Sequence, residues 1–235
     1  MAFVHSPKIV TDGLVLALDA GNVKSYPGSG TTWSDKSGYG NDGTLINGPT
    51  FDSDNGGSIV FDGSNDYVDC GNASSINIPN DLSVNLWIKI GLIDATWRGI
   101  IAKRESGGLT NYGINFNSSP NAFQWYFNFW SGFKVLSVPL NTNFTTGIWY
   151  NICTIFQKSS TNTLAYIYKN GILLNSGTLS GNVTTSTASL NIGLSSGASG
   201  EYFMGNIAIT QIYNRALSAT EVLQNYNATK GRFGL

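Results

Sequence analysis

Carboxylate and imidazole side chains are the first places to look for catalysis in this chain, and they are sparse. There are three glutamates, Glu105, Glu201 and Glu221, and a single histidine, His5. Glycoside hydrolysis needs two carboxyl groups that flank one bond, yet no two glutamates are strand neighbours and no Asp pair at i, i+2 within a strand replaces them. His5 lies in the N-terminal arm, so a histidine-based triad is not supported. The sequence therefore predicts a protein that is not an enzyme.

Two glycine-rich loops concentrate oxygen ligands. The first contains Asp35, Ser37, Asn41 and Asp42, and the second contains Asp62, Asn65, Asp66 and Asp69. Calcium prefers clustered carboxylate and carbonyl oxygens on flexible turns, which makes Asp62 and Asp66 the better candidate metal ligands. The spacing matches no fixed calcium-loop motif, and Asp and Asn side chains also cap turns without any metal. Both readings stay open.

The most aromatic segment is residues 122–133, AFQWYFNFWSGF. In a strand, alternate side chains face opposite sides, so one face carries Phe123, Trp125, Phe127 and Phe129 and is expected to be core. The other face carries Gln124, Tyr126, Asn128 and Trp130. Aromatic rings beside amides hold neutral sugars by stacking and directional hydrogen bonds. We predict a ligand-binding surface there, or a face covered by a loop or a partner protein.

The elements that must position these residues are nearly all strands. Alternating or β-branched runs predict strands at residues 13–20, 58–62, 66–70, 82–90, 99–104, 112–117, 122–133, 149–157, 164–169, 172–174, 190–194 and 205–213. Gly63-Ser64-Asn65 predicts a hairpin between the runs 58–62 and 66–70. One helix should begin after Ser218, whose S-x-x-E spacing with Glu221 is that of a capping box.

The amino-acid composition restricts the partners that the protein can bind. The chain has 235 residues, of which 41% are hydrophobic and only 11% charged, with a net charge of −1. Binding to a nucleic-acid backbone requires a basic surface, so nucleic acid is excluded as a partner. Neither a signal peptide nor a run of apolar residues long enough to span a membrane is visible. Cys70 and Cys153 are expected to be buried free thiols, although a disulfide stays open.

A set of motifs, taken together, resembles one family. GGSIVFDGSNDYVDCG, LSVNLWIK, GIIAKR, GIWYNICTIF, LAYIYKNGILL, LNIG and GNIAITQIYNRALSATEVLQNY occur in this order over about residues 13–228. This order is similar to that of LamG-like domains in the concanavalin A-like lectin/glucanase superfamily. The resemblance implies an all-β fold, a two-sheet antiparallel jelly-roll sandwich with one short C-terminal helix. We expect one domain over 1–235, with an N-terminal arm (1–12) and a C-terminal tail (229–235) that either docks or frays.

The segment GLVLALDAGNVKSYPGSGTTWSDKSGYGNDGTLINGPTF and the ending NYNATKGRFGL look more specifically like virion proteins of tailed bacteriophages, especially phages of marine bacteria. This resemblance implies a non-enzymatic surface module of the virion, such as an appendage, fibre or decoration protein, made in the host cytoplasm. Its partners would be neutral host glycans, other virion proteins or further copies of itself. The alternatives are a calcium-dependent lectin outside any virion and, more remotely, a glycoside hydrolase.

Overall fold

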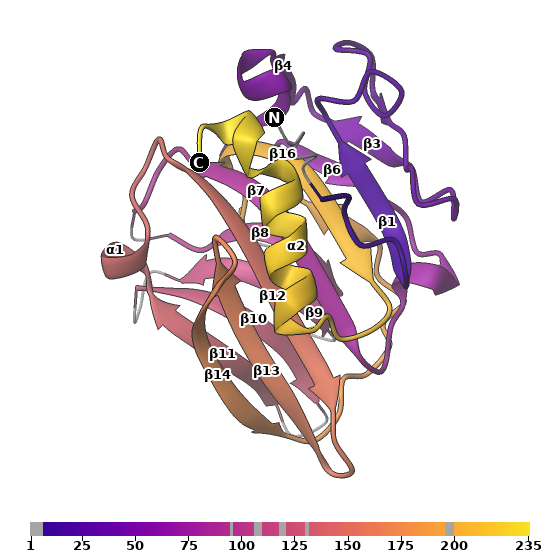
Figure 1. The fold of residues 1–235 in the computed structure, drawn as a ribbon, viewed down its shortest axis with the longest axis vertical. Coiled ribbons are helices and arrows are strands. Elements are labelled where there is room, and N and C mark those ends of the chain that lie inside the picture. The colour runs from indigo at the N-terminus through magenta and orange to yellow at the C-terminus, as the bar shows by residue number, and fades with distance from the viewer. Residues whose placement is uncertain (1–6, 95, 106–109, 118–120, 130–131, 196–199) are drawn as a thin grey trace, which may run out of the picture.

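The computed structural model describes residues 7–94, 96–105, 110–117, 121–129, 132–195 and 200–235, which form two packed antiparallel sheets (Figure 1). Sheet A has eight strands in the order β14-β13-β12-β7-β16-β5-β4, with β1 also paired to β16. Their bounds are Ile172–Ser180, Asn162–Lys169, Trp149–Lys158, Leu82–Ile90, Met204–Tyr213, Ser58–Asp62 and Thr50–Asp52, with β1 at Leu14–Asp19.

Sheet B has eight strands in the order β11-β10-β9-β8-β15-β6-β3-β2. Their bounds are Gly132–Pro139, Ala122–Phe129, Thr110–Asn117, Arg98–Arg104, Leu190–Ile192, Tyr67–Asp69, Gly43–Ile46 and Thr32–Trp33. Short helical turns lie at η1 (Asp54–Gly56), η2 (Ser74–Ile76), α1 (Leu140–Asn143) and η3 (Lys230–Phe233), and the main helix is α2 (Ala219–Thr229). No helix in the described ranges is long and apolar enough to cross a membrane.

The main core lies between the sheets and follows the alternation of the strands. Every second residue of β7 in sheet A points into this core, and so does every second residue of β10 in sheet B. The residues from β7 are Leu82, Val84, Leu86, Ile88 and Ile90, and those from β10 are Phe123, Trp125 and Phe127. The rings of Trp125 and Phe156 stack across the interface with centroids 4.1 Å apart. Phe123, Trp125 and Phe127 of the predicted inner face, and the predicted sandwich, are therefore confirmed, whereas the side chain of Phe129 lies outside the described residues. The single strand predicted over residues 122–133 is wrong, because β10 ends at Phe129 and β11 begins at Gly132.

The predicted hairpin between residues 58–62 and 66–70 is wrong. Strand β5 pairs with β16 and β4 in sheet A, whereas β6 pairs with β15 and β3 in sheet B. The turn between them carries the chain from one sheet to the other, with Gly63 at φ 78° packed against Met204 and Arg98. Alternation predicts that each run is a strand, but it does not specify the neighbour with which the strand pairs.

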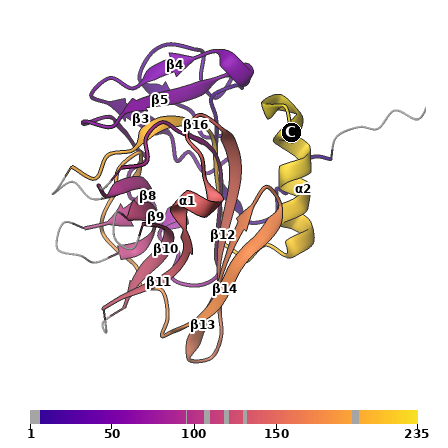
Figure 2. The same ribbon diagram turned by 90° about the vertical axis from the view of Figure 1, so that its left-hand side faces the viewer.

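Helix α2 covers the outer face of sheet A (Figure 2). One apolar cluster lies beneath α2 and includes Tyr213, Leu217 and Val222. A second cluster lies beneath the following turn, η3, and includes Trp87, Trp149 and Phe233. Trp87 and Trp149 are buried under the C-terminal segment rather than between the sheets. The central strands β7 and β16 of sheet A are thus buried on both faces.

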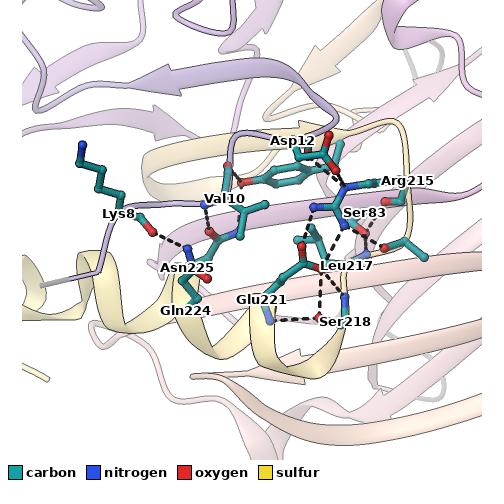
Figure 3. Close-up of polar contacts among 12 residues, drawn as sticks. Lys8, Val10, Asp12, Ser83, Arg215, Leu217, Ser218, Glu221, Gln224 and Asn225 are labelled. Carbon is teal, nitrogen blue, oxygen red and sulfur yellow. Dashed lines mark hydrogen bonds and ion pairs between the residues drawn. The ribbon is translucent and has the colours of Figure 1, made fainter.

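The capping box is present as predicted (Figure 3). Ser218 Oγ accepts the Glu221 backbone N–H at 3.3 Å, and Glu221 Oε2 accepts the Ser218 N–H at 2.8 Å. Arg215 Nη2 lies 2.6 Å from Glu221 Oε1, and this contact is the largest cause that lowers the pKa of Glu221 to about 2. The N-terminal arm joins the same cluster, since the Val10 N–H donates to Asn225 Oδ1 at 2.8 Å.

The C-terminal tail docks on its own domain and is not frayed. Phe233 stacks on Trp87 with ring centroids 4.0 Å apart and lies 4.8 Å from Trp149. Arg232 pairs with Asp19 at 2.5 Å and also donates to the carbonyls of Asn55 and Gly57. Cys70 and Cys153 are free and buried, and burial raises the pKa of both thiols well above the ordinary value.

Replacing Ser218 by alanine should lower the free energy of unfolding by about 1 kcal/mol, because one backbone N–H of α2 loses its side-chain acceptor. Denaturant titration followed by circular dichroism measures the change. The control is Ser159→Ala in the β12–β13 turn, an exposed serine whose Oγ takes part in none of the described hydrogen bonds. Equal midpoints for the two variants would contradict the capping role.

Replacing Phe233 by alanine should lower the free energy of unfolding by about 3 kcal/mol, because a buried ring leaves a cavity against Trp87. The matched control is Leu235→Ala, two residues further on and 47% exposed, which should change stability little. Tryptophan fluorescence during urea unfolding reports both stability and the environment of the indoles. An unchanged midpoint for Phe233→Ala would show that the tail is detached in solution.

Candidate functional site

The second oxygen-rich loop is organised as a capped turn. Asp62 Oδ1 accepts the N–H groups of Ser64 and Asn65 at 2.8 and 3.4 Å, and Asp66 Oδ2 accepts the Asp62 N–H at 3.1 Å. The backbone N–H of Ser64 is the main cause that lowers the pKa of Asp62, whereas burial raises the pKa of Asp66. Both carboxylates therefore hold the turn that carries the chain from sheet A to sheet B.

The first loop is built around the buried carboxylate of Asp35. Its oxygens accept the N–H of Ala17 and Ser37 at 2.8 Å each, the Asn41 N–H at 3.0 Å and the Ser37 hydroxyl at 2.6 Å. The described residues contain no group of three Asp, Glu, His or Cys side chains arranged to hold a metal. The donors around these carboxylates are those of turn capping, which is the alternative to the calcium site expected at Asp62 and Asp66.

A pocket of about 370 Å³ lies on the face of sheet B that points away from sheet A. Four adjacent strands contribute to it, together with the segment that precedes β8 and the one that precedes β16. The described lining residues are Trp97, Arg104, Asn115, Gln124, Tyr126, Val135 and Glu201. The residues of β10 that line it alternate with Phe123 and Trp125, which face the core.

Two glycines create the hollow. Gly113 is the cross-strand partner of Tyr126, and a Cβ at Gly113 would lie 2.4 Å from the tyrosine ring. A Cβ at Gly99 would lie 2.0 Å from the backbone nitrogen of Ser195. The absence of side chains at these two positions lets Tyr126 lie across β9 and lets Ser195 approach β8, so that the tyrosine hydroxyl and Ser195 Oγ are 2.8 Å apart.

Tyr126 is part of the pocket wall, not an exposed platform as the sequence suggested. Only 3% of the residue is exposed, and burial raises the pKa of its phenol. The glycine opposite it explains the difference, because the ring folds down onto the sheet instead of standing out from it.

Two amides lie side by side on the outer face. Asn115 on β9 and Gln124 on β10 are cross-strand partners. Asn115 is only 2% exposed, and its Oδ1 has no hydrogen-bond partner among the described residues. Asn115 and Gln124 therefore place two neighbouring amides in the lining of one pocket.

The charged part of the pocket is an ion pair. Arg104 Nη1 lies 3.2 Å from Glu201 Oε2, and the two side chains are 19% and 12% exposed. Arg104 Nη1 also lies 3.3 Å from Ser195 Oγ. The Glu201 carbonyl accepts the backbone N–H of Gly99 at 3.0 Å, which fixes this residue against β8.

Trp97 supplies an exposed aromatic ring, with 42% of the residue accessible to solvent. The residues beside it are anchored, since Arg98 pairs with Asp94 at 2.6 Å and also donates to the Tyr202 carbonyl at 3.1 Å. The same guanidinium holds the pKa of Asp94 far below its ordinary value. The ring is therefore carried on a segment that is fixed by charge-assisted hydrogen bonds.

The structure brings together two of the four residues expected to bind a ligand, Gln124 and Tyr126. Asn128 belongs to β10, but its side chain lies outside what the structure describes, as does the whole of Trp130. The sequence interpretation missed Trp97, Arg104, Asn115, Val135 and Glu201. Asn115 could have been found from the sequence, because it is a polar residue at an outward-facing position of the alternating strand YGINF. Trp97 and Glu201 could not, because they lie in connecting segments that reach the sheet only in the folded structure.

The described lining of the pocket is poor in carboxylates. Among the described residues, its only carboxylate is Glu201, whereas hydrolysis uses two. Glu105 is occupied elsewhere, because its Oε1 accepts the Thr187 N–H at 2.8 Å and the Thr187 hydroxyl at 2.7 Å. What the pocket offers is an aromatic ring, two amides, a phenol and a neutralised ion pair.

Comparison with solved structures gave several toxin domains of similar fold. The binding domain of Paraclostridial Mosquitocidal Protein 1 has a TM-score of 0.71 at 16% identity, over 93% of this chain and 52% of the toxin domain. The receptor-binding domain of botulinum neurotoxin type G has a TM-score of 0.68 at 18% identity, over 92% and 51%. The botulinum neurotoxin serotype D ligand-binding domain, in complex with N-acetylneuraminic acid, has a TM-score of 0.70 at 16% identity, over 92% and 51%.

This chain therefore spans about half the length of those toxin domains, and the likeness establishes a shared fold. A comparison with curated protein sequences gave no significant match. The family model Laminin_G_3 matches residues 62–223, which is more than half of the chain. The chain belongs to the concanavalin A-like lectin/glucanases superfamily.

Proposed function

We propose that this protein is a non-catalytic glycan-binding module and that the pocket on the outer face of sheet B holds a neutral sugar. The observation that carries the proposal is that one pocket of about 370 Å³ is lined by an exposed ring, Trp97, and by two neighbouring amides, Asn115 and Gln124. Sugar rings present an apolar face and a rim of hydroxyl groups. Sites for them combine an aromatic surface with a few directed polar groups.

Each group of the pocket has a role in this proposal. The indole of Trp97 stacks against the apolar face of the sugar, and Val135 extends the apolar surface. Asn115 and Gln124 exchange hydrogen bonds with hydroxyl or acetamido groups. Tyr126 closes the wall, since its hydroxyl is held 2.8 Å from Ser195 Oγ.

The family and the structural neighbours support this choice over catalysis. The family description includes both lectins and glucanases, and the pocket lacks the second carboxylate of a glucanase among the described residues. One neighbour of the same fold has been solved with N-acetylneuraminic acid. That protein supports a sugar as the class of ligand, although only about half of it corresponds to this chain.

We further propose that the module is displayed on the surface of a phage particle, where it binds neutral host glycans. The resemblance of residues 13–51 and of the C-terminal ending to virion proteins of tailed phages supports this setting. A virion protein seated over the pocket is the competing occupant. Exposure distinguishes the two, because antibodies against the pocket rim reach an adhesin on intact particles but cannot reach a covered interface.

Replacing Trp97 by alanine should weaken binding to neutral glycans by at least about tenfold, because the stacking ring is lost. A glycan array identifies the neutral ligand, and calorimetry then measures its Kd for the wild type and the variant. Tyr39→Ala is the matched control, an aromatic residue that is 58% exposed in the first oxygen-rich loop. The melting temperature should stay nearly constant for both.

Gln124→Ala provides a second test at the opposite part of the pocket and should weaken the same ligand. The proposal is contradicted if the wild type binds no glycan on the array. It is equally contradicted if the Kd is unchanged in both Trp97→Ala and Gln124→Ala.

Calcium is not part of the proposed site, because the carboxylates of Asp62 and Asp66 cap a turn. We expect the melting temperature and the Kd for the neutral glycan to be the same in calcium chloride and in EDTA. A rise in melting temperature with calcium that Asp62→Asn abolishes would show instead that the loop binds the ion.

A further inference from the structure

We infer that Glu201 determines specificity, because it neutralises Arg104 and thereby keeps sugars that carry a carboxylate out of the pocket. This inference rests on the proposed function and adds to it the reason why the ligand is neutral. It starts from an ion pair that lies in the wall of the pocket instead of on the open surface, with Arg104 Nη1 and Glu201 Oε2 3.2 Å apart.

An arginine in a sugar pocket would ordinarily favour acidic ligands. The guanidinium presents parallel N–H donors that match a carboxylate, and such charge-assisted bonds are stronger than neutral ones. Glu201 already pairs with one of these donors, Arg104 Nη1, at 3.2 Å. A sugar carboxylate that approached Arg104 would meet the carboxylate of Glu201 at the same place, and like charges in contact cost several kcal/mol.

Glu201 is held in position by its backbone as well as by its side chain. Its carbonyl accepts the N–H of Gly99 at 3.0 Å and that of Ser195 at 3.3 Å. Gly99 and Ser195 are the pair whose close approach helps to form the hollow. The side chain of Glu201 is only 12% exposed, so solvent and salt screen its charge weakly.

Among the described residues that line the pocket, Arg104 and Glu201 carry the only charges. Lys103 neighbours Arg104 in the chain, but its ammonium donates to Asn72 Oδ1 and the Ala188 carbonyl. Arg98 is paired with Asp94 at 2.6 Å. Residues 95, 106–109, 118–120, 130–131 and 196–199 contain no Asp, Glu, Lys, Arg or His in the sequence. The formal charge of the pocket lining is therefore that of Arg104 and Glu201 together, which is zero.

The test removes the charge of Glu201 while keeping its shape. Glu201→Gln leaves Arg104 as the one charged residue of the described lining, so the pocket becomes cationic. The probes are methyl glycosides of glucose, N-acetylglucosamine, glucuronic acid and N-acetylneuraminic acid, measured by calorimetry and on an array of neutral and acidic oligosaccharides. Melting temperatures confirm that each variant is folded, and Glu201→Ala removes the same charge without introducing an amide.

We expect the wild type to bind neutral probes and to reject acidic ones. Glu201→Gln should bind the acidic probes at least about tenfold more tightly than the wild type does, and added salt should reduce that gain. The double variant Glu201→Gln/Arg104→Gln restores a neutral lining and should lose the gain. Affinity for neutral probes should change much less than affinity for acidic ones.

Two results overturn the inference while leaving the proposed function intact. One is a wild type that binds acidic and neutral probes equally well. The other is retained neutral binding in Glu201→Gln and Glu201→Ala with no gain for acidic probes. If the wild type binds neither class of probe, the proposed function fails and this inference fails with it.

Discussion

The stacking of the C-terminal segment on the outer face of sheet A determines which face of the sandwich stays available. Phe233 lies 4.0 Å from Trp87, and α2 seals the neighbouring apolar cluster around Tyr213 and Val222. The central strands β7 and β16 of sheet A are consequently buried on both sides. This packing covers the outer face of sheet A at its centre, whereas the pocket lies on the outer face of sheet B.

The shape of the pocket depends on two positions that have no side chain. Gly99 and Gly113 leave room for Ser195 and for the ring of Tyr126, so a twisted strand surface becomes a hollow. The polar groups around it differ in how they are satisfied: Tyr126 and Arg104 both reach Ser195, whereas Asn115 Oδ1 has no partner among the described residues. Small-molecule sites are usually largely pre-formed, and the hydrogen bonds to Ser195 hold this wall of the pocket in place without a ligand.

Local patterns in the sequence were sufficient to predict much of the fold. Alternation predicted most of the strands and the inner face of β10, but it did not predict β2, β3, β4 or β11. The S-x-x-E spacing predicted the start of α2 at Ser218. The pairing of the strands was not predictable from alternation. Strands β5 and β6 pair with β16 and β15, which lie far away in the sequence and in different sheets. The site was predicted in part: Gln124 and Tyr126 line it, but Trp97 and Glu201 reach it only through tertiary packing. Tyr126 was expected to be exposed, and the glycine opposite it explains why it is buried.

The central claim is that a neutral sugar stacks on Trp97, and the tryptophan side chains report on it directly. The chain has six tryptophans, and each indole N–H gives its own cross-peak in a two-dimensional proton–nitrogen NMR spectrum. Titration with the neutral glycan should shift the Trp97 cross-peak, while those of the buried Trp87 and Trp149 stay in place. A titration in which bound glycan leaves the Trp97 cross-peak unchanged would contradict the account.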